Sequence, residues 1–232
     1  MSLLSSDRAS SWVVEETQML VTLPSIEAGP LCEKKIIPIT RVYSQWRNIV
    51  LNTGACWRVL NLHTPKAAAV FARRSNNGNL RLYVNELVHR RKAPLSTSQV
   101  ALCRKDASQL SSIELNSSLS GLRKHAAIFQ ECPLPRLQRL KLLHESLSTI
   151  RIESPLITEG PSRAPLRSVE LCNVAIDWTS PIYRDLMSLT LTSKGRTIEI
   201  SVDQLLDILT QCPRLRKLSI SGLEIETHSR ST

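Results

Sequence analysis

The sequence predicts an α/β fold in which short parallel strands alternate with helices along a repeating, solenoid-like array. Three observations support this prediction. A leucine-rich pattern recurs along the second half of the chain, and the segments between its copies have helical periodicity. The apolar residues are mostly aliphatic, because 42% of the 232 residues are hydrophobic and only 4% are aromatic. Such a composition suits many layered aliphatic contacts, and the length allows one domain or two unequal ones.

Five segments share the pattern L-x-x-L-x-L, with Ile or Val replacing some leucines. Their first residues lie 27, 29, 20 and 29 positions apart, which is the period of a leucine-rich repeat. A short strand explains each segment, since alternate apolar residues point into the core and the residues between them face outward. Two segments continue in phase, to Ile176 and Ile225. The five segments are residues 110–115, 137–142, 166–171, 186–191 and 215–220.

The connecting segments predict helices. Ser201 and Gln204 form a capping box, and the apolar residues that follow lie on one face of a helix of about ten residues. Residues 96–99, Ser-Thr-Ser-Gln, have the same capping-box pattern, and the apolar residues of 121–130 also have helical spacing. Two joints contain Cys-Pro, at Cys132 and Cys212, where Pro ends the helix and Cys is expected to be buried.

The repeat that starts at residue 166 is too short for a helix. Residues 177–181, Asp-Trp-Thr-Ser-Pro, predict a loop or a short turn there. A sheet with helices on both faces is the alternative fold, but such sheets have strands that are buried on both sides. Charged residues at 139, 141, 216 and 217 within the strand segments favour strands with one exposed face.

A further helix is predicted over residues 39–51. Apolar residues recur there at steps of three and four, beginning at Ile39. Thr40 is placed to cap the start of this helix and Gly54 to end it, and Trp57 follows just beyond. We expect Trp46 and Trp57, at least in part, to close a small helical core.

The segment 30–57, PLCEKKIIPITRVYSQWRNIVLNTGACW, resembles the second half of an F-box as it occurs in the large families of mushroom-type fungi. The common phrase in those families is V-C-x-x-W-R-x-I-A-L-x-T-P-x-L-W, and helix-"CP-x-L-x-x-L-x-L" repeats follow it, as the two Cys-Pro joints do here. The residues that match in order and spacing are Val42, Trp46, Arg47, Ile49, Leu51, Thr53 and Trp57.

The chain departs from the family pattern at several positions. Tyr43 stands where the family has Cys, and Gly54 stands where it has Pro. Leu23 and Pro24 begin as an F-box does, but the chain breaks at residues 29–30, Gly-Pro, where the first F-box helix should run. The resemblance is therefore to an F-box/leucine-rich-repeat protein with an incomplete, degenerate F-box.

This resemblance implies three regions and a receptor function. Residues 1–19 would be a tail without stable structure, residues 20–65 an incomplete α-helical F-box-like segment, and residues 66–232 a leucine-rich-repeat-like array. F-box proteins are substrate-recognition subunits of SCF-type ubiquitin ligases, in which other subunits transfer ubiquitin. The implied partners are an SCF adaptor and a target protein. The residues implied for adaptor docking are Leu23, Pro24, Val42, Trp46, Ile49 and Trp57.

Repeat arrays of this kind bind their partners on the face that the strands line. The mixture of residues expected there is polar with a cationic bias, which leaves open an acidic or phosphorylated target, or a face that is simply solvated. The candidate target-binding residues are Gln138, Arg139, Lys141, Arg167, Glu170, Arg216, Lys217 and Ser219. An orphan repeat scaffold that has lost adaptor docking remains the alternative function.

The sequence predicts neither an enzyme nor a cofactor. It contains no nucleophile elbow, phosphate-binding glycine loop, zinc-protease motif or dinucleotide-binding glycine pattern. The six cysteines are widely separated, without a zinc-site spacing or a readable disulfide framework, so we expect a reducing intracellular compartment, cytoplasmic or nuclear. We expect no metal and no membrane-spanning segment, since the longest purely apolar run is residues 67–72.

The net charge of +10 is concentrated in the first half of the chain. Residues 1–110 hold 15 Lys and Arg against 7 Asp and Glu, whereas the remaining residues hold 15 against 13. A basic half can indicate a nucleic acid or an acidic protein partner. The densest basic run, residues 89–92, has no interleaved aromatic residue and no glycine-rich loop, which does not favour nucleic acid. The oligomeric state stays open.

Overall fold

The computed structural model describes residues 44–62, 65–86, 97–130, 132, 134–144, 149–152, 166–195 and 198–226. The chain divides into two compact units, Met1–Cys56 and Trp57–Thr232. In the described part of the first unit the backbone forms one helix, α3 (Ser44–Asn52), and then enters the 3-10 turn η1 (Gly54–Trp57).

Helix α3 confirms the expected helix over its described residues. The predicted start of that helix, at Thr40, lies outside them. The helix ends next to Thr53, whose Oγ1 donates a hydrogen bond to the Ile49 carbonyl oxygen at 2.7 Å. The Thr53 backbone N–H donates to the same oxygen at 2.9 Å. Both bonds satisfy the Ile49 carbonyl oxygen in the last turn of the helix. The helix therefore ends just before Gly54, close to the predicted position.

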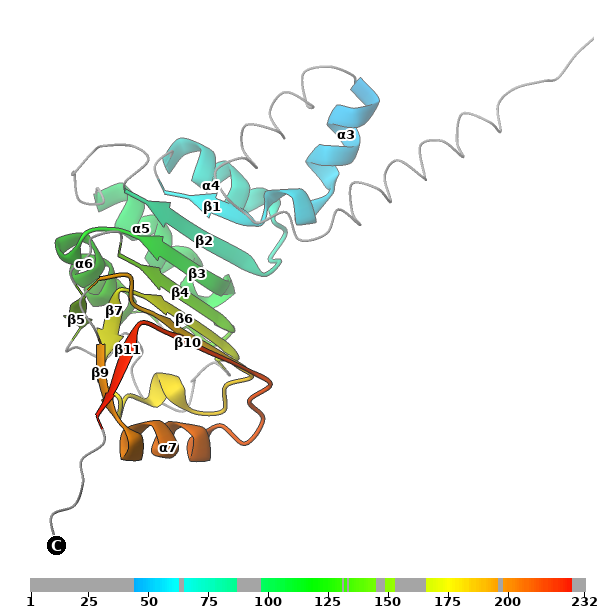
Figure 1. Cartoon of the computed structure of the whole chain (residues 1–232). Coiled ribbons are helices and arrows are strands. Elements are labelled where there is room, and N and C mark those ends of the chain that lie inside the picture. The colour runs from blue at the N-terminus through cyan, green and yellow to red at the C-terminus, as the bar shows by residue number, and fades with distance from the viewer. Residues whose placement is uncertain are drawn as a thin grey trace, which may run out of the picture. The chain divides into compact units, whose positions relative to one another are not determined.

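Seven parallel strands form the central sheet of the second unit (Figure 1). The order of the strands across the sheet is the same as their order in the sequence. The short strands that intervene in the sequence belong to two separate two-stranded sheets. All five predicted strand segments are strands of this sheet, and β1 and β2 extend it beyond them. In order across the sheet the strands are β1 (Val59–Asn61), β2 (Leu80–Asn85), β3 (Leu110–Asn116), β4 (Arg139–Leu143), β6 (Ser168–Cys172), β8 (Ser188–Thr192) and β10 (Lys217–Ser221).

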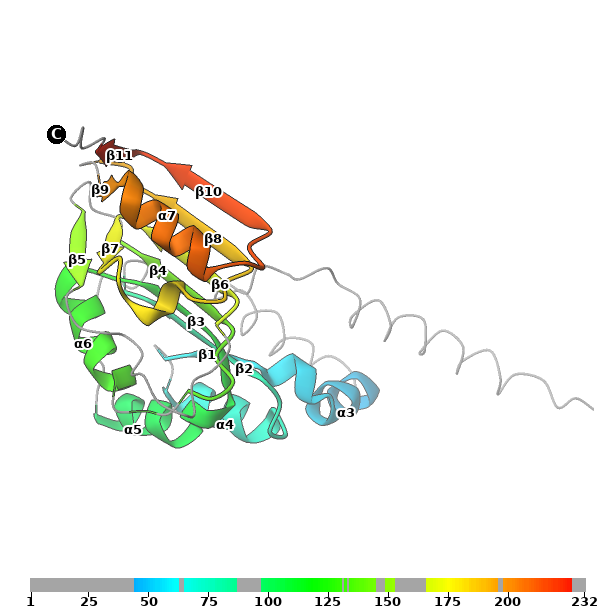
Figure 2. The ribbon, with the colours of Figure 1, turned by 90° about the horizontal axis from the view of Figure 1, so that it is seen from below.

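Helices connect most of these strands and lie on the same side of the sheet, as Figure 2 shows. Within the second unit, no described helix covers the other face. The step between β6 and β8 has the 3-10 turn η3 (Pro181–Tyr183) as its only helical segment, which confirms the predicted short connection. The remaining elements are α4 (Pro65–Arg74), α5 (Thr97–Asp106) with the turn η2 (Ala107–Gln109), α6 (Leu119–Gln130) and α7 (Val202–Gln211).

The chain turns a corner after the central strands and forms short second strands there. Strand β5 (Ile150–Ile152) pairs in parallel with β7 (Val174–Ile176), and β9 (Ile198–Ser201) pairs with β11 (Leu223–Glu226). Two of the corners use left-handed backbone, at Asn173 (φ 55°) and Gly222 (φ 69°), conformations that Asn and Gly adopt most readily. The patterns that run on to Ile176 and Ile225 therefore each describe two strands joined by a bend.

The core lies between the central sheet and its helices. The alternate leucine-like residues of the repeats point into it, and each fully buried leucine contributes roughly 1.5–3 kcal/mol to folding. The expected buried cysteines are confirmed: Cys132 is 7% exposed and Cys212 is 2% exposed. The predicted capping box is also present, since Gln204 N donates to Ser201 Oγ and Ser201 N donates to Gln204 Oε1, both at 3.1 Å.

Candidate functional site

The face of the central sheet that carries no described helix is the candidate functional site. Strand pairing aligns its side chains in rows, because residues opposite one another in a parallel sheet point the same way. We call this surface the strand face. Its first row is Arg81, Ser112, Arg139, Ser168, Ser188 and Lys217, and its second row is Tyr83, Glu114, Lys141, Glu170, Thr190 and Ser219.

An ion-paired row crosses the middle of the strand face. Lys141 Nζ lies 3.7 Å from Glu114 Oε1 and 3.3 Å from Glu170 Oε1. All three side chains are partly exposed, and pairs of this kind are each worth about 1 kcal/mol or less. The two carboxylates partly neutralise the positive charge of Lys141, so that this charge is less available to a binding partner.

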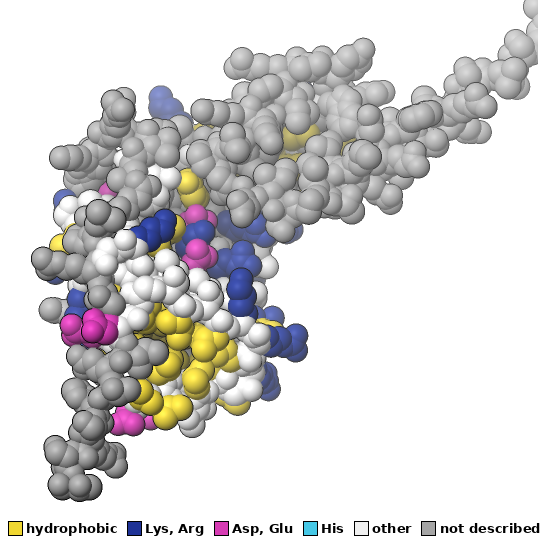
Figure 3. Space-filling model, in the orientation of Figure 1, with side chains coloured by type: hydrophobic (Ala, Val, Ile, Leu, Met, Phe, Trp, Pro, Cys, Tyr) yellow, Lys and Arg dark blue, Asp and Glu magenta, His cyan; other side chains and the backbone are white. Residues whose placement is uncertain are grey.

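Four other cations of this region are exposed, in addition to Arg81 on β2. Arg139 and Lys217 belong to the first row, while Arg167 and Arg216 directly precede β6 and β10. Among the described residues no ion pair involves any of these four side chains. Figure 3 shows Lys and Arg side chains gathered along the side of the sheet at which the strands begin. With strands about 4.8 Å apart, Arg167 and Arg216 are separated by roughly 10 Å.

The structure brings the predicted target-binding residues together. Gln138, Arg167 and Arg216 lie in one backbone-bonded line, in which Arg167 N donates to the Gln138 carbonyl oxygen at 2.8 Å and Met187 connects Arg167 to Arg216. Arg139, Lys141, Glu170, Lys217 and Ser219 lie in the two rows of the strand face.

The residues implied for adaptor docking are not assembled in the described part of the chain. Leu23, Pro24 and Val42 lie outside the described residues. Trp46 belongs to α3, but its side chain is not among those described, and Ile49 is a half-buried residue of the same helix.

Trp57 has a different environment, because it packs inside the second unit. Its side chain is 3% exposed and makes an edge-to-face contact with Phe71 at a centroid distance of 4.8 Å. The Arg74 guanidinium lies 4.7 Å from the Trp57 ring centroid, a cation–π contact. Trp57 is thus a core residue beside α4 and has little surface with which to contact a partner.

A polar column at the corner of the sheet was not predicted. It contains the residue that follows each central strand from β2 to β8, and its backbone N–H groups donate to the carbonyl at the end of the next strand at 2.8 to 3.2 Å. The signal in the sequence is a polar residue two positions after the last leucine-like residue of a repeat. The column is Glu86, Ser117, His144, Asn173 and Ser193.

Side chains link the members of this column. His144 Nδ1 lies 3.0 Å from the Ser117 carbonyl oxygen, and Asn173 Nδ2 donates to the His144 carbonyl oxygen at 2.8 Å. Lys194 N donates to Asn173 Oδ1 at 2.6 Å. These bonds satisfy buried polar groups where the chain turns the corner, which would otherwise cost about 1–3 kcal/mol each.

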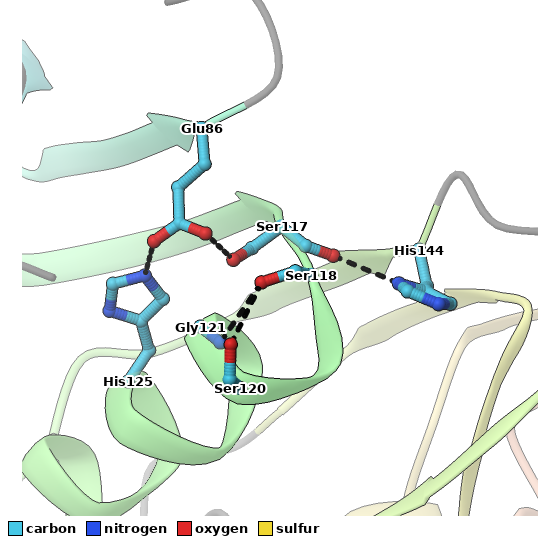
Figure 4. A network of polar contacts seen from close by, with 7 residues as sticks. All are labelled: Glu86, Ser117, Ser118, Ser120, Gly121, His125 and His144. Carbon is cyan, nitrogen blue, oxygen red and sulfur yellow. Dashed lines mark hydrogen bonds and ion pairs between the residues drawn. The ribbon is translucent and has the colours of Figure 1, made fainter. Parts of the chain in front are cut away.

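The densest polar cluster lies at the first members of the column (Figure 4). The Glu86 carboxylate accepts a hydrogen bond from Ser117 Oγ, and its other oxygen lies 3.2 Å from His125 Nε2. Burial by itself would raise the pKa of Glu86. The hydrogen bonds from His125 and Ser117 and the charge of His125 outweigh burial and hold that pKa below its usual value of 4.5.

The order of groups in this cluster differs from that of a hydrolase triad. A nucleophilic serine needs a base beside it, and that base needs an orienting carboxylate behind it. Here the Glu86 carboxylate lies between Ser117 and His125, so that Ser117 faces the carboxylate and not the imidazole. The arrangement is suited to holding β2, β3 and α6 together.

The described residues include no group of three or more His, Cys, Asp or Glu that could hold a metal ion. No helix in the described part of the chain is long and apolar enough to cross a membrane. Comparison of the chain with protein-family models, with curated proteins and with solved structures found no significant match.

Proposed function

We propose that the protein is a non-catalytic protein-interaction module built as a leucine-rich-repeat-like solenoid. The observation that carries this proposal is the one-sided central sheet, in which helices lie on one face and rows of polar side chains line the other. The sequential strand order and the leucine period support the solenoid, because stacked repeats place each strand beside that of the next repeat.

The chemistry of the strand face favours an acidic or phosphorylated target. Arg139, Arg167 and Arg216 each present a guanidinium fork that matches carboxylate or phosphate oxygens, and the nearby carboxylates of Glu114 and Glu170 are held by Lys141. From Arg139 to Lys217 the sheet spans three strand spacings, roughly 14 Å. An extended segment of four or five residues covers that distance.

We further propose that the chain is the substrate-recognition subunit of an SCF-type ubiquitin ligase. This part rests on the resemblance of residues 30–57 to an F-box and on the helix that the structure has at Ser44–Asn52. Because Trp57 is buried, docking would rely on α3, the helix to which Trp46 and Ile49 belong. The strand face would then hold the target, while other subunits transfer ubiquitin.

An orphan scaffold that binds a target without an adaptor is the second candidate. Two observations favour it: the sequence has Gly-Pro at residues 29–30, where the F-box pattern requires a helix, and Trp57 packs into the core of the second unit. In this case the strand face keeps its role and residues 20–65 have none in a ligase.

Co-purification of the full chain with an SCF adaptor subunit separates the two candidates. The receptor predicts that the adaptor is recovered at equal stoichiometry and that Trp46→Ala removes it. Arg123→Ala on the exposed surface of α6 is the matched control and should retain the adaptor. Thermal unfolding must be the same for both variants. Failure of the unmodified chain to bind the adaptor would contradict the receptor and leave the scaffold.

A further inference from the structure

The last layer of the second unit exposes residues that earlier layers bury. Leu206 and Val202 of α7 are 54% and 38% exposed, and Leu218 of β10 is 42% exposed. One strand further inside, Leu189 and Leu191 of β8 are 0% and 1% exposed. We call the surface of Val202, Leu206 and Leu218 the open end. Figure 3 shows hydrophobic side chains gathered in this region, over α7 and β10.

The orientation of α7 shows which way the open end faces. Val202 and Leu206 are one turn apart and share a side of the helix, while Ile208 is buried toward the sheet. Gln211 lies on the opposite flank, where its Oε1 accepts a hydrogen bond from Arg184 of the preceding layer at 3.3 Å. The exposed leucine and valine therefore face away from the preceding layer, toward the position that a further layer would occupy.

The open end also includes a free strand edge. Among the described strands β10 pairs with β8 alone, so the backbone groups on its other edge have no strand partner there. A free edge beside apolar side chains is a template for pairing with another chain. Whatever covers it should supply both a strand edge and an apolar surface.

We propose that a second copy of this chain covers the open end, related to the first by a two-fold axis that pairs the two β10 strands antiparallel. The strand is self-complementary when the pairing is centred on Ser219. Leu218 then lies opposite Ile220 of the second copy, and Lys217 lies opposite Ser221 of the second copy. This register overlaps all five residues of β10 and places no like charges directly opposite each other.

Charge complementarity on α7 supports the same arrangement. A two-fold axis at β10 places the two α7 helices side by side and antiparallel. The exposed Asp203 in the first turn of one helix then approaches Arg214, which follows the end of the other helix. Both strand faces remain on the same side of the joined sheet, so that dimerisation leaves target binding unobstructed.

Sedimentation of the full chain tests this interface. Between about 1 and 100 µM, a range that brackets a Kd of about 10 µM, we expect the mass to rise from 26.0 kDa to twice that value. Leu206→Glu and Leu218→Lys should each weaken dimerisation by about tenfold or more. Both residues are exposed, so folding should be unaffected. Arg123→Glu on α6 is the control that should still dimerise.

Cysteine cross-linking tests the register. Paired residues in antiparallel strands have Cα atoms about 4.5–5.5 Å apart, which is within disulfide range. Ser219→Cys should therefore form a dimer under mild oxidation, whereas Lys217→Cys should do so only when mixed with Ser221→Cys. A mass of one chain throughout the concentration range overturns the proposal, as does a dimer that survives Leu218→Lys or does not cross-link through residue 219. A dimer of either of these kinds would place the interface between copies away from β10.

Discussion

At the scale of single residues, Gly121 is the position on which the polar corner depends. It lies in the first turn of α6, and a methyl group there would overlap the Ser117 hydroxyl and the Glu86 carboxylate. The absence of a side chain allows the carboxylate to lie near the start of the helix, where the backbone of Ser118 also donates a hydrogen bond to it. A negative charge is favourable at this end of a helix.

We predict that Gly121→Ala destabilises the protein by about 2 kcal/mol. Alanine normally stabilises a helix by about 1 kcal/mol relative to glycine, but overpacking costs about 1–3 kcal/mol and displacing Glu86 disturbs its hydrogen bonds as well. Chemical denaturation measures the difference. Ser120→Ala in the same turn is the control, because that side chain is exposed. Equal or greater stability of Gly121→Ala would show that the carboxylate is not held in this position.

The lowered pKa of Glu86 predicts a pH dependence. A carboxyl group with a lower pKa in the folded state stabilises the protein above its unfolded-state pKa, and this contribution is lost as the pH falls through the folded-state pKa. The unmodified chain should lose stability below about pH 4.5 partly for this reason. Glu86→Gln should be less stable at pH 7 and should show a shallower loss below pH 4.5. Parallel stability curves for the two proteins, measured by denaturation at several pH values, would contradict the assigned role.

The sequence contains only part of the information needed to find this cluster. Polar residues at a fixed offset after each repeat mark the column, and that signal is local. The contact between Glu86 and His125 cannot be found in this way, because 39 positions separate the two residues in the sequence. It depends on how α6 packs beside β2 and β3.

At the scale of single elements, α7 illustrates what local sequence decides. Its capping box and its length follow from residues within one helix, and the structure has both. The predicted apolar face is not buried, because Val202 and Leu206 are exposed and Ile208 is the residue of this helix that is buried. Strands β1 and β2 were not among the predicted repeats because they lack the full L-x-x-L-x-L pattern. The pairing of β2 with β3 shifts register between Leu80 and Arg81, which displaces the first leucine from its usual spacing.

We predict that Ser201→Ala destabilises the protein by about 1 kcal/mol. The substitution removes the hydroxyl that accepts from Gln204 N and leaves a backbone donor of the first turn without this partner. Ser201→Asp should retain most of the stability, because aspartate caps helices equally well. Urea denaturation of the two variants measures the difference, and indistinguishable midpoints for Ser201→Ala and the unmodified chain would contradict the role of the cap.

At the scale of the whole molecule, the central sheet of the second unit packs against helices on one face and carries rows of mostly polar side chains on the other. The charged strand residues in the sequence predicted this division, because a strand that carries Arg139 and Lys141 between leucines cannot be buried on both sides. The sequence left two roles open for Trp57, that of a core residue and that of an adaptor contact. Its spacing from Trp46 matches the F-box phrase, yet its side chain completes the core beside Phe71.

Reversal of the strand-face charge tests the central claim most directly. Arg139, Arg167, Arg216 and Lys217 are changed together to Glu, and the control changes the same number of exposed cations on the helices: Lys66, Lys105, Arg123 and Lys124. Binding to acidic and phosphorylated peptides of four to ten residues is measured by fluorescence anisotropy at a fixed salt concentration, since both variants carry the same net charge. We predict that the strand-face variant loses about tenfold or more in affinity, while the control keeps most of it. Equal losses in the two variants, or no binding by the unmodified chain, would contradict an acidic target on the strand face.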